Sequence, residues 1–97
     1  MAEPLRSSDF TPHIGKQVRV PGWGHALRLA TVEVASGSAM PGAPRAPFTL
    51  IFHGPRGEVL PEGLYQVEIA AGPRVELYIV PIATKASDRQ DYQAVFN

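Results

Sequence analysis

Hydrophobic and polar residues alternate with a period of two through most of this chain. The alternation is clear at Gln17-Val18-Arg19-Val20, and it recurs in five further segments. Those segments are residues 26–35, then Phe48, Leu50 and Phe52, then Tyr65, Val67 and Ile69, then Val75, Leu77 and Ile79, and last Tyr92, Ala94 and Phe96. Because successive side chains of a strand point to opposite faces, the pattern predicts six short strands, each with one buried side.

The alternation in residues 26–35 changes phase partway along the segment. Leu27 and Leu29 share one face, whereas the next apolar residues are Val32 and Val34. A slip of one residue within a strand is typical of a β-bulge, which inserts one extra residue on one strand of a pair. The pattern therefore predicts a bulge near Ala30-Thr31.

Proline and glycine restrict helical structure to the beginning of the chain. The 97 residues include ten prolines and nine glycines, and a proline inside a helix costs about 3 kcal/mol or more. The helix we expect is one or two turns over Ser7–Gly15. Ser7 or Ser8 would cap its N-terminus, and Gly15 would end it in the left-handed conformation. Phe10 and Ile14 are four residues apart, so on such a helix both would enter the core.

Six strands separated by turns rich in glycine and proline predict an all-β fold. We expect a small antiparallel barrel or sandwich of about six strands with one short N-terminal helix. A chain of 97 residues can bury one core but is too short for two, so residues 1–97 are expected to form a single domain. The stretch 37–47 lacks periodicity and predicts a mobile surface loop.

The hairpin of the fourth and fifth strands has a register that the apolar pattern constrains. Pairing Ala70 with Arg74 places apolar residues opposite one another on one face. The same register sets Glu68 opposite Glu76 on the other face. Like charges opposite each other destabilise a sheet, so we expect a cationic group nearby, from Arg74, Arg28 or a partner protein.

The charge and the composition exclude several classes of partner. Nine lysines and arginines balance nine acidic residues, 44% of the chain is hydrophobic, and cysteine is absent. Dispersed, neutralised cations give no electrostatic reason to expect nucleic acid or an anionic membrane. No apolar run approaches the roughly 20 residues that a membrane-spanning helix needs. We therefore expect neither a nucleic-acid partner nor a membrane partner.

The sequence contains no catalytic or metal-binding motif that we can identify. His13, His25 and His53 do not follow the spacing of zinc ligands. Gly22-Trp23-Gly24 lacks the lysine and the following helix of a phosphate-binding loop. We accordingly expect a non-catalytic protein with no cofactor and no metal.

The alternative is a small-ligand-binding or hydrolytic β-barrel with a carboxylate site. Glu68 and Glu76 are its candidate acid–base pair, because two close carboxylates can share a proton. His53 and Trp23 would complete such a site at the mouth of the barrel. Trp23 itself has two interpretations, a hydrophobic cap over the core or an exposed contact residue.

Four motifs occur in a fixed order along the chain. They are Phe48-Thr49-Leu50-Ile51-Phe52-His53-Gly54-Pro55, Leu60-Pro61-Glu62-Gly63-Leu64-Tyr65-Gln66-Val67-Glu68, Tyr78-Ile79-Val80-Pro81-Ile82 and Tyr92-Gln93-Ala94-Val95-Phe96-Asn97. In this order they resemble a family of short bacterial proteins known only as a domain of unknown function. That resemblance implies no catalytic residues, and it implies genes that neighbour phage-tail-collar-type fibre proteins.

These observations favour a structural or interaction module of a larger assembly. The resemblance implies an accessory or subunit of a phage-tail-like fibre, with a fibre or tail-collar-type protein as partner and a second copy of the chain as the other candidate. The last strand, Asp91–Asn97, could pair with a partner by strand addition. The residues that we expect to serve this interaction are Trp23, Tyr92, Phe96, Glu68 and Glu76.

The N-terminal residues also carry an expectation about location. No basic segment precedes an apolar run near Met1, so we expect no signal peptide and synthesis in the cytoplasm. A fibre component would then be incorporated into an extracellular or phage-like particle.

Overall fold

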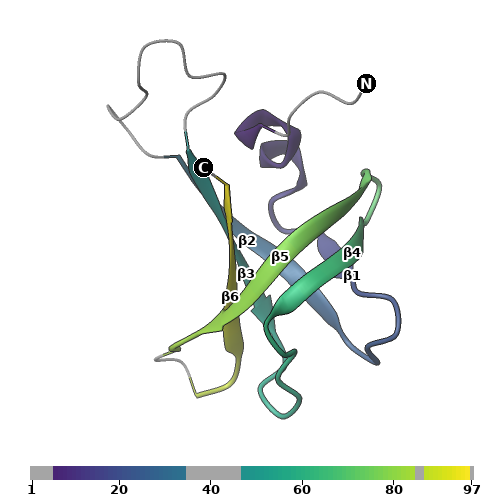
Figure 1. Ribbon diagram of the computed structural model, residues 1–97, viewed down its shortest axis with the longest axis vertical. Helices are drawn as coiled ribbons and strands as arrows, with labels where there is room; N and C mark the ends of the chain where they lie inside the picture. Colours follow the sequence, from purple (N-terminus) through teal and green to yellow (C-terminus); the bar gives the residue numbers. More distant parts are fainter. Residues whose placement is uncertain (1–5, 35–46, 85–86, 97) are drawn as a thin grey trace.

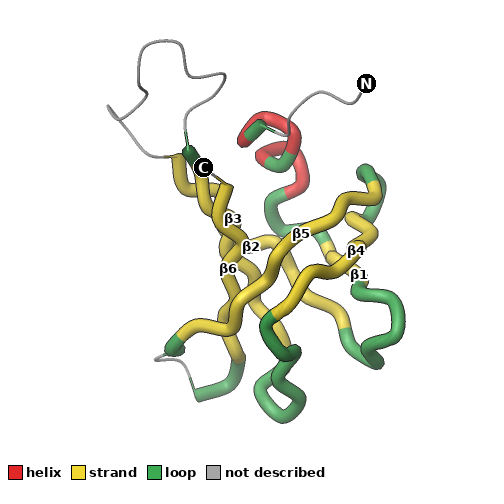
Figure 2. Tube along the Cα trace, in the orientation of Figure 1, coloured by secondary structure: helices red, strands yellow, loops and turns green. Residues whose placement is uncertain are grey.

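The predicted strands close into a barrel. A computed structural model describes residues 6–34, 47–84 and 87–96 of the chain. Its elements are the 3-10 turns η1 (Ser7–Asp9) and η2 (Thr11–His13) and the strands β1 (Gln17–Arg19), β2 (Ala26–Val34), β3 (Phe48–Gly54), β4 (Gly63–Ile69), β5 (Arg74–Ile82) and β6 (Gln90–Phe96). The strands form a closed antiparallel barrel in the order β1-β2-β3-β6-β5-β4 (Figures 1 and 2). The prediction of an all-β fold with a short N-terminal helical segment is confirmed. The sequence left a barrel and a sandwich as alternatives, and the structure is a barrel.

The interior of the barrel is filled by the apolar residues of the alternating pattern. No polar or charged residue is buried within the described part of the chain. The buried side chains are Phe10, Val18, Val20, Leu27, Leu29, Phe48, Leu50, Phe52, Leu60, Val67, Ile69, Leu77, Ile79, Tyr92 and Ala94. Burial of this apolar face is the main free-energy term that favours the fold.

The N-terminal turns contribute one aromatic side chain to the core. Phe10 is fully buried, and its ring centroid lies 5.9 Å from that of Phe48 and 5.7 Å from that of Phe96. The rings of Phe48 and Phe96 are stacked with centroids 4.5 Å apart. Phe10 therefore joins the N-terminal segment to the ends of β3 and β6.

Two details of the expected N-terminal helix are wrong. Ile14 is 44% exposed, because the segment forms two 3-10 turns and Ile14 leaves the second turn in an extended conformation. The cap is not a serine: the Asp9 carboxylate accepts the backbone N–H of Arg6 at 2.8 Å. Gly15 has a φ of 88°, so the left-handed glycine is confirmed.

Among the described residues no helix is long and apolar enough to cross a membrane.

The bulge predicted in β2 is confirmed. Leu29 lies opposite Phe52 and Thr31 lies opposite Ile51, so Ala30 is the extra residue between them. The bulge lets Val32 pack against the core after the phase change, whereas Val34 at the end of β2 is 50% exposed.

The predicted register of the β4–β5 hairpin is wrong by two residues. Arg74 lies opposite Glu68 rather than Ala70. A shift of two leaves the same side chains on the inner face, so the apolar pattern cannot distinguish the two registers. The observed turn contains Ala71 in the left-handed conformation, with a φ of 57°. Glu68 therefore lies 3.4 Å from Arg74 and is not opposite Glu76.

Residues 55–62 connect β3 to β4, two strands that are not neighbours in the barrel. This crossover loop spans one end of the barrel (Figure 1). Leu60 is buried, and its backbone N–H donates to the Tyr92 hydroxyl at 2.8 Å. The Tyr65 hydroxyl donates to the Pro61 carbonyl at 2.6 Å. Two tyrosines thus attach the loop to the barrel. The loop predicted over 37–47 lies outside the described residues, apart from its last residue.

Candidate functional site

The pairing between β5 and β6 is incomplete. β6 pairs with β3 from Gln90 to Phe96, but it pairs with β5 only where Asp91–Gln93 lie opposite Val80–Ile82. Beyond these positions the two strands diverge toward the N-terminal turns (Figure 1). Within the described residues, the rest of β6 and residues 74–79 of β5 therefore flank a gap in the ladder of backbone hydrogen bonds.

Backbone groups of β6 point into this gap. The N–H of Asp91 donates at 2.8 Å to the hydroxyl of Thr84, which lies two residues after the end of β5. Asp91 therefore directs its backbone groups toward β5. Because alternate residues of a strand direct their N–H and C=O groups to the same side, Val95 does so as well. Val95 lies beyond the last residue of β6 that pairs with β5.

Backbone groups of β5 face the same gap from the other side. Ile82 lies opposite Asp91, so its backbone groups point toward β6. By the same alternation, Tyr78 and Glu76 also direct their N–H and C=O groups toward β6. The residues of β5 that alternate with these direct their backbone groups toward β4 and complete the β4–β5 ladder. The gap is thus bordered by two partly open strand edges.

Exposed apolar side chains lie on β5 and β6 at these open edges and on β4 next to β5. Leu64 is 61% exposed, Tyr78 is 51% exposed and Val95 is 52% exposed. Leu64 and Tyr78 are paired directly across β4 and β5. The Tyr78 hydroxyl donates to the Glu62 carboxylate, and this bond raises the pKa of Tyr78. We call Leu64, Tyr78, Val95 and the backbone of Glu76 the β5–β6 surface.

The aromatic residues expected at an interface lie mainly within the barrel. Tyr92 is fully buried. Phe96 is half-buried and packs against the core beside the gap. Trp23, in the β1–β2 loop, is also half-buried, and its ring lies 6.4 Å from that of Tyr92 and 5.2 Å from that of His25. Of the three, Phe96 lies closest along the chain to the β5–β6 surface.

The two glutamates expected to act together lie apart. The Glu68 carboxylate lies 3.6 Å from Arg19 and 3.4 Å from Arg74, so two guanidinium groups neutralise it. Glu76 is exposed and lies opposite Gln66. The expected cation beside Glu68 is therefore Arg74, joined by Arg19.

The geometry does not assemble the carboxylate site of the alternative hypothesis. His53, Trp23 and Glu68 line three different surface hollows. Glu76 lies on the outer face of β5 and does not pair with Glu68. Within the described residues no group of three or more His, Cys, Asp or Glu side chains is placed to hold a metal ion.

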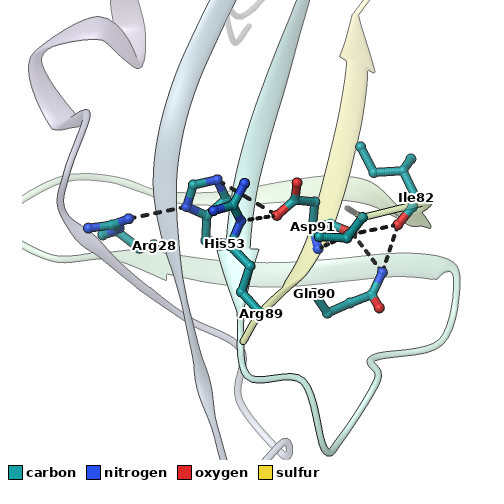
Figure 3. Close-up of polar contacts among 7 residues, drawn as sticks. Arg28, His53, Ile82, Arg89, Gln90 and Asp91 are labelled. Carbon is teal, nitrogen blue, oxygen red and sulfur yellow. Dashed lines mark hydrogen bonds and ion pairs between the residues drawn. The ribbon is translucent and has the colours of Figure 1, made fainter. Parts of the chain in front are cut away.

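A row of polar side chains crosses the outer surface of β1, β2, β3 and β6. Gln17 lies opposite Arg28, Arg28 opposite His53, and His53 opposite Asp91. Because directly opposite residues share a face of the sheet, the four side chains lie on the outer surface. Figure 3 shows three of them, Arg28, His53 and Asp91, side by side. Each is next in sequence to an inward apolar residue, so its outward direction follows from the alternation. The order of the strands, which brings them together, does not.

The members of this row are joined by polar contacts. Arg28 Nη2 donates to His53 Nδ1 at 3.1 Å, and His53 Nε2 lies 3.7 Å from Asp91 Oδ1 (Figure 3). Arg89, one residue before β6, donates from Nε to the same Asp91 oxygen at 2.7 Å. From here on, the name polar row refers to the four residues that these contacts join, which are Arg28, His53, Arg89 and Asp91.

The surroundings of His53 favour its neutral form. Burial lowers the pKa of His53, and the positive charge of Arg89 lowers it further, whereas Asp91 acts in the opposite direction. Arg28 can only donate, so Nδ1 of the neutral imidazole is the acceptor and Nε2 carries the proton. A hollow of about 510 Å³ lies beside these groups.

Comparison with known proteins identifies a family. No curated protein and no solved structure matches the chain. A family model described as "Domain of unknown function (DUF6916)" matches residues 5–96. This agrees with the resemblance to a domain of unknown function that the four sequence motifs indicated. The chain belongs to the DUF6916 family.

Proposed function

We propose that this chain is a non-catalytic interaction module of a larger assembly, an accessory or subunit of a phage-tail-like fibre. Its partner is a fibre or tail-collar-type protein that adds an extended segment at the β5–β6 surface. The observation that carries this proposal is the short β5–β6 pairing, three residues on each strand. The assignment to a fibre follows from the resemblance set out under the sequence motifs.

An extended segment is the occupant that the chemistry of the gap favours. Glu76, Tyr78 and Val95 direct backbone donors and acceptors into it, and an added strand pairs with such groups. A helix cannot do so, because its own backbone groups are already paired. The occupant is therefore a segment that is extended where it meets β5 or β6.

The side chains around the gap supply apolar contact. Leu64, Tyr78 and Val95 are each more than half exposed. Complete burial of an aliphatic or aromatic side chain of this size contributes about 1.5–3 kcal/mol. We expect alternate residues of the partner strand to be apolar, because only one of its faces lies over this surface.

The experiment begins with the partner itself. The tagged chain is purified from its native host, the bound protein is identified, and the complex is reconstituted from the two purified proteins. Affinity is then measured for Val95→Lys and Leu64→Lys. Val59→Lys is the matched control, because Val59 is 50% exposed on the crossover loop, outside this surface.

The proposal predicts that both surface variants weaken binding at least tenfold while Val59→Lys binds like the natural chain. Circular dichroism of each variant establishes that the barrel is folded. Equal affinity of all three variants would contradict the proposal. So would a chain that forms only homodimers, with dimerisation lost in Val95→Lys, because the occupant would then be a second copy.

A further inference from the structure

We propose that the hollow beside the polar row binds a small oxyanion, a phosphate or carboxylate group, held by Arg28 and Arg89 with His53 between them. This site lies on the β1, β2, β3 and β6 side of the barrel and is separate from the β5–β6 surface. It therefore adds a ligand to the proposed interaction function and does not depend on it.

Arg28 has unused capacity to bind an anion. A guanidinium group carries five N–H donors, and the bond to His53 Nδ1 uses one of them. Arg28 is exposed, and within the described residues no carboxylate lies at ion-pair distance from it. A planar guanidinium of this kind matches the two oxygens of a carboxylate or phosphate group.

Arg89 supplies a second guanidinium to the same hollow. Its Nε atom is engaged by Asp91 at 2.7 Å, which fixes the plane of the group and leaves its two terminal nitrogens outside that contact. The Arg89 side chain is 41% exposed. Arg28 and Arg89 both line the hollow, together with His53, Gln17 and Asp88. Its volume of about 510 Å³ lies in the usual range for small-molecule sites.

The charges around His53 connect its protonation to the anion. Arg28 of β2 and Arg89 disfavour the imidazolium, whereas Asp91 of β6 and Asp88 favour it. Gln17 of β1 is neutral. An oxyanion between the two arginines would offset their charge and raise the pKa of His53. The protonated ring would donate from Nδ1, so Arg28 would turn its donors from the ring to the anion.

Two probes test the site on the whole chain. Sulfate represents a tetrahedral phosphate group, and its charge is constant between pH 5 and 8; acetate represents a carboxylate. Binding is followed by NMR through the resonances of the His53 ring and the arginine side chains. We expect saturable shifts at Arg28, Arg89 and His53, tighter sulfate binding at pH 5.5 than at pH 7.5, and a higher His53 pKa in saturating sulfate. The probe that binds more tightly identifies the class of anion.

Substitutions distinguish this site from general screening by salt. Arg28→Gln should weaken binding of the preferred probe at least tenfold. Arg74→Gln should leave it unchanged, because Arg74 is an exposed arginine that pairs with Glu68 and does not line the hollow. His53→Asn should bind with an affinity that no longer rises as the pH falls. Equal effects of the two arginine variants, shifts that do not saturate, or an unchanged His53 pKa in sulfate would each overturn the proposal.

Discussion

Replacing Tyr92 by Phe removes one buried hydroxyl beneath the crossover loop and tests how that loop is held. Tyr92 is fully buried and Leu60 is 3% exposed, and the Leu60 N–H donates to the hydroxyl at 2.8 Å. Phe keeps the ring contacts but leaves that N–H buried without an acceptor. An unsatisfied buried donor costs about 1–3 kcal/mol. We therefore expect the free energy of unfolding to fall by about that amount.

Trp23 makes the measurement direct. It is the only tryptophan, and its ring lies 6.4 Å from that of Tyr92, so its fluorescence should report urea unfolding of this region. In a domain of this size the melting temperature should fall by about 4–8 °C for each kcal/mol. Tyr65→Phe is the matched control, because its hydroxyl bond to Pro61 is exposed and should contribute less. Equal losses in the two variants, both below about 0.5 kcal/mol, would refute the reasoning.

The same hydroxyl predicts a dependence on alkaline pH. Burial raises the pKa of Tyr92 above its usual value of 10.0, and the bond from Leu60 opposes that shift. As the pH rises above about 10, the unfolded chain loses this proton before the folded chain does. The contribution of Tyr92 to stability is thus complete below pH 10 and is lost as the pH rises toward the folded pKa. Tyr92→Phe should lose less stability over that range, and identical pH slopes for the two proteins would contradict the assignment.

Three further changes test the packing and the polar row. Gly54→Ala should lower stability by about 1–3 kcal/mol, because a Cβ there would lie 2.7 Å from the Leu27 side chain. Gly57→Ala is the control and should keep the stability of the natural chain, because the space around Gly57 is open. Equal midpoints of urea unfolding for the two variants would contradict this. The lowered pKa of His53 predicts that stability falls as the pH drops from about 6.5 through the folded pKa. His53→Gln should lack that part of the fall in acid titrations followed by circular dichroism. Deleting residues 92–97 should abolish cooperative unfolding, because β6 pairs with both β3 and β5; a cooperative transition in the truncated chain would contradict this.

Much of the fold follows from the period-two pattern, because an alternating segment has one face to bury. The bulge at Ala30 follows as well, since it appears as a change of phase. The register of the β4–β5 hairpin does not follow, because a shift of two residues keeps every side chain on its own face. The charges carried information that the apolar pattern lacked: the observed register puts Glu68 beside Arg74 and avoids a pair of glutamates.

Pro81 shows that a proline does not have to end a strand of this barrel. It lies within β5, opposite Tyr92. The backbone groups of Ile82 point toward β6, so those of its neighbour Pro81 point away from β6 and toward the β4 side. On that side β4 no longer pairs with β5 beyond Ile79. The missing N–H therefore removes no hydrogen bond of the barrel.

The candidate sites depend on which strands become neighbours. Arg28, His53 and Asp91 come from three strands, and only the order β2-β3-β6 aligns them. The gap between β5 and β6 likewise arises from how far two strands run together. Strand order in a barrel is set by the packing of the whole core, so neither site could be located from local patterns.

Amide hydrogen exchange in the reconstituted complex tests the central claim most directly. In the free chain the N–H groups of Glu76, Tyr78 and Val95 face the gap, and we expect them to exchange faster than those that pair β4 with β5. An added strand should slow their exchange at least tenfold on binding of the partner, while the exchange of residues on the crossover loop stays unchanged. A tight complex in which these three amides exchange as fast as in the free chain would contradict strand addition at the β5–β6 surface.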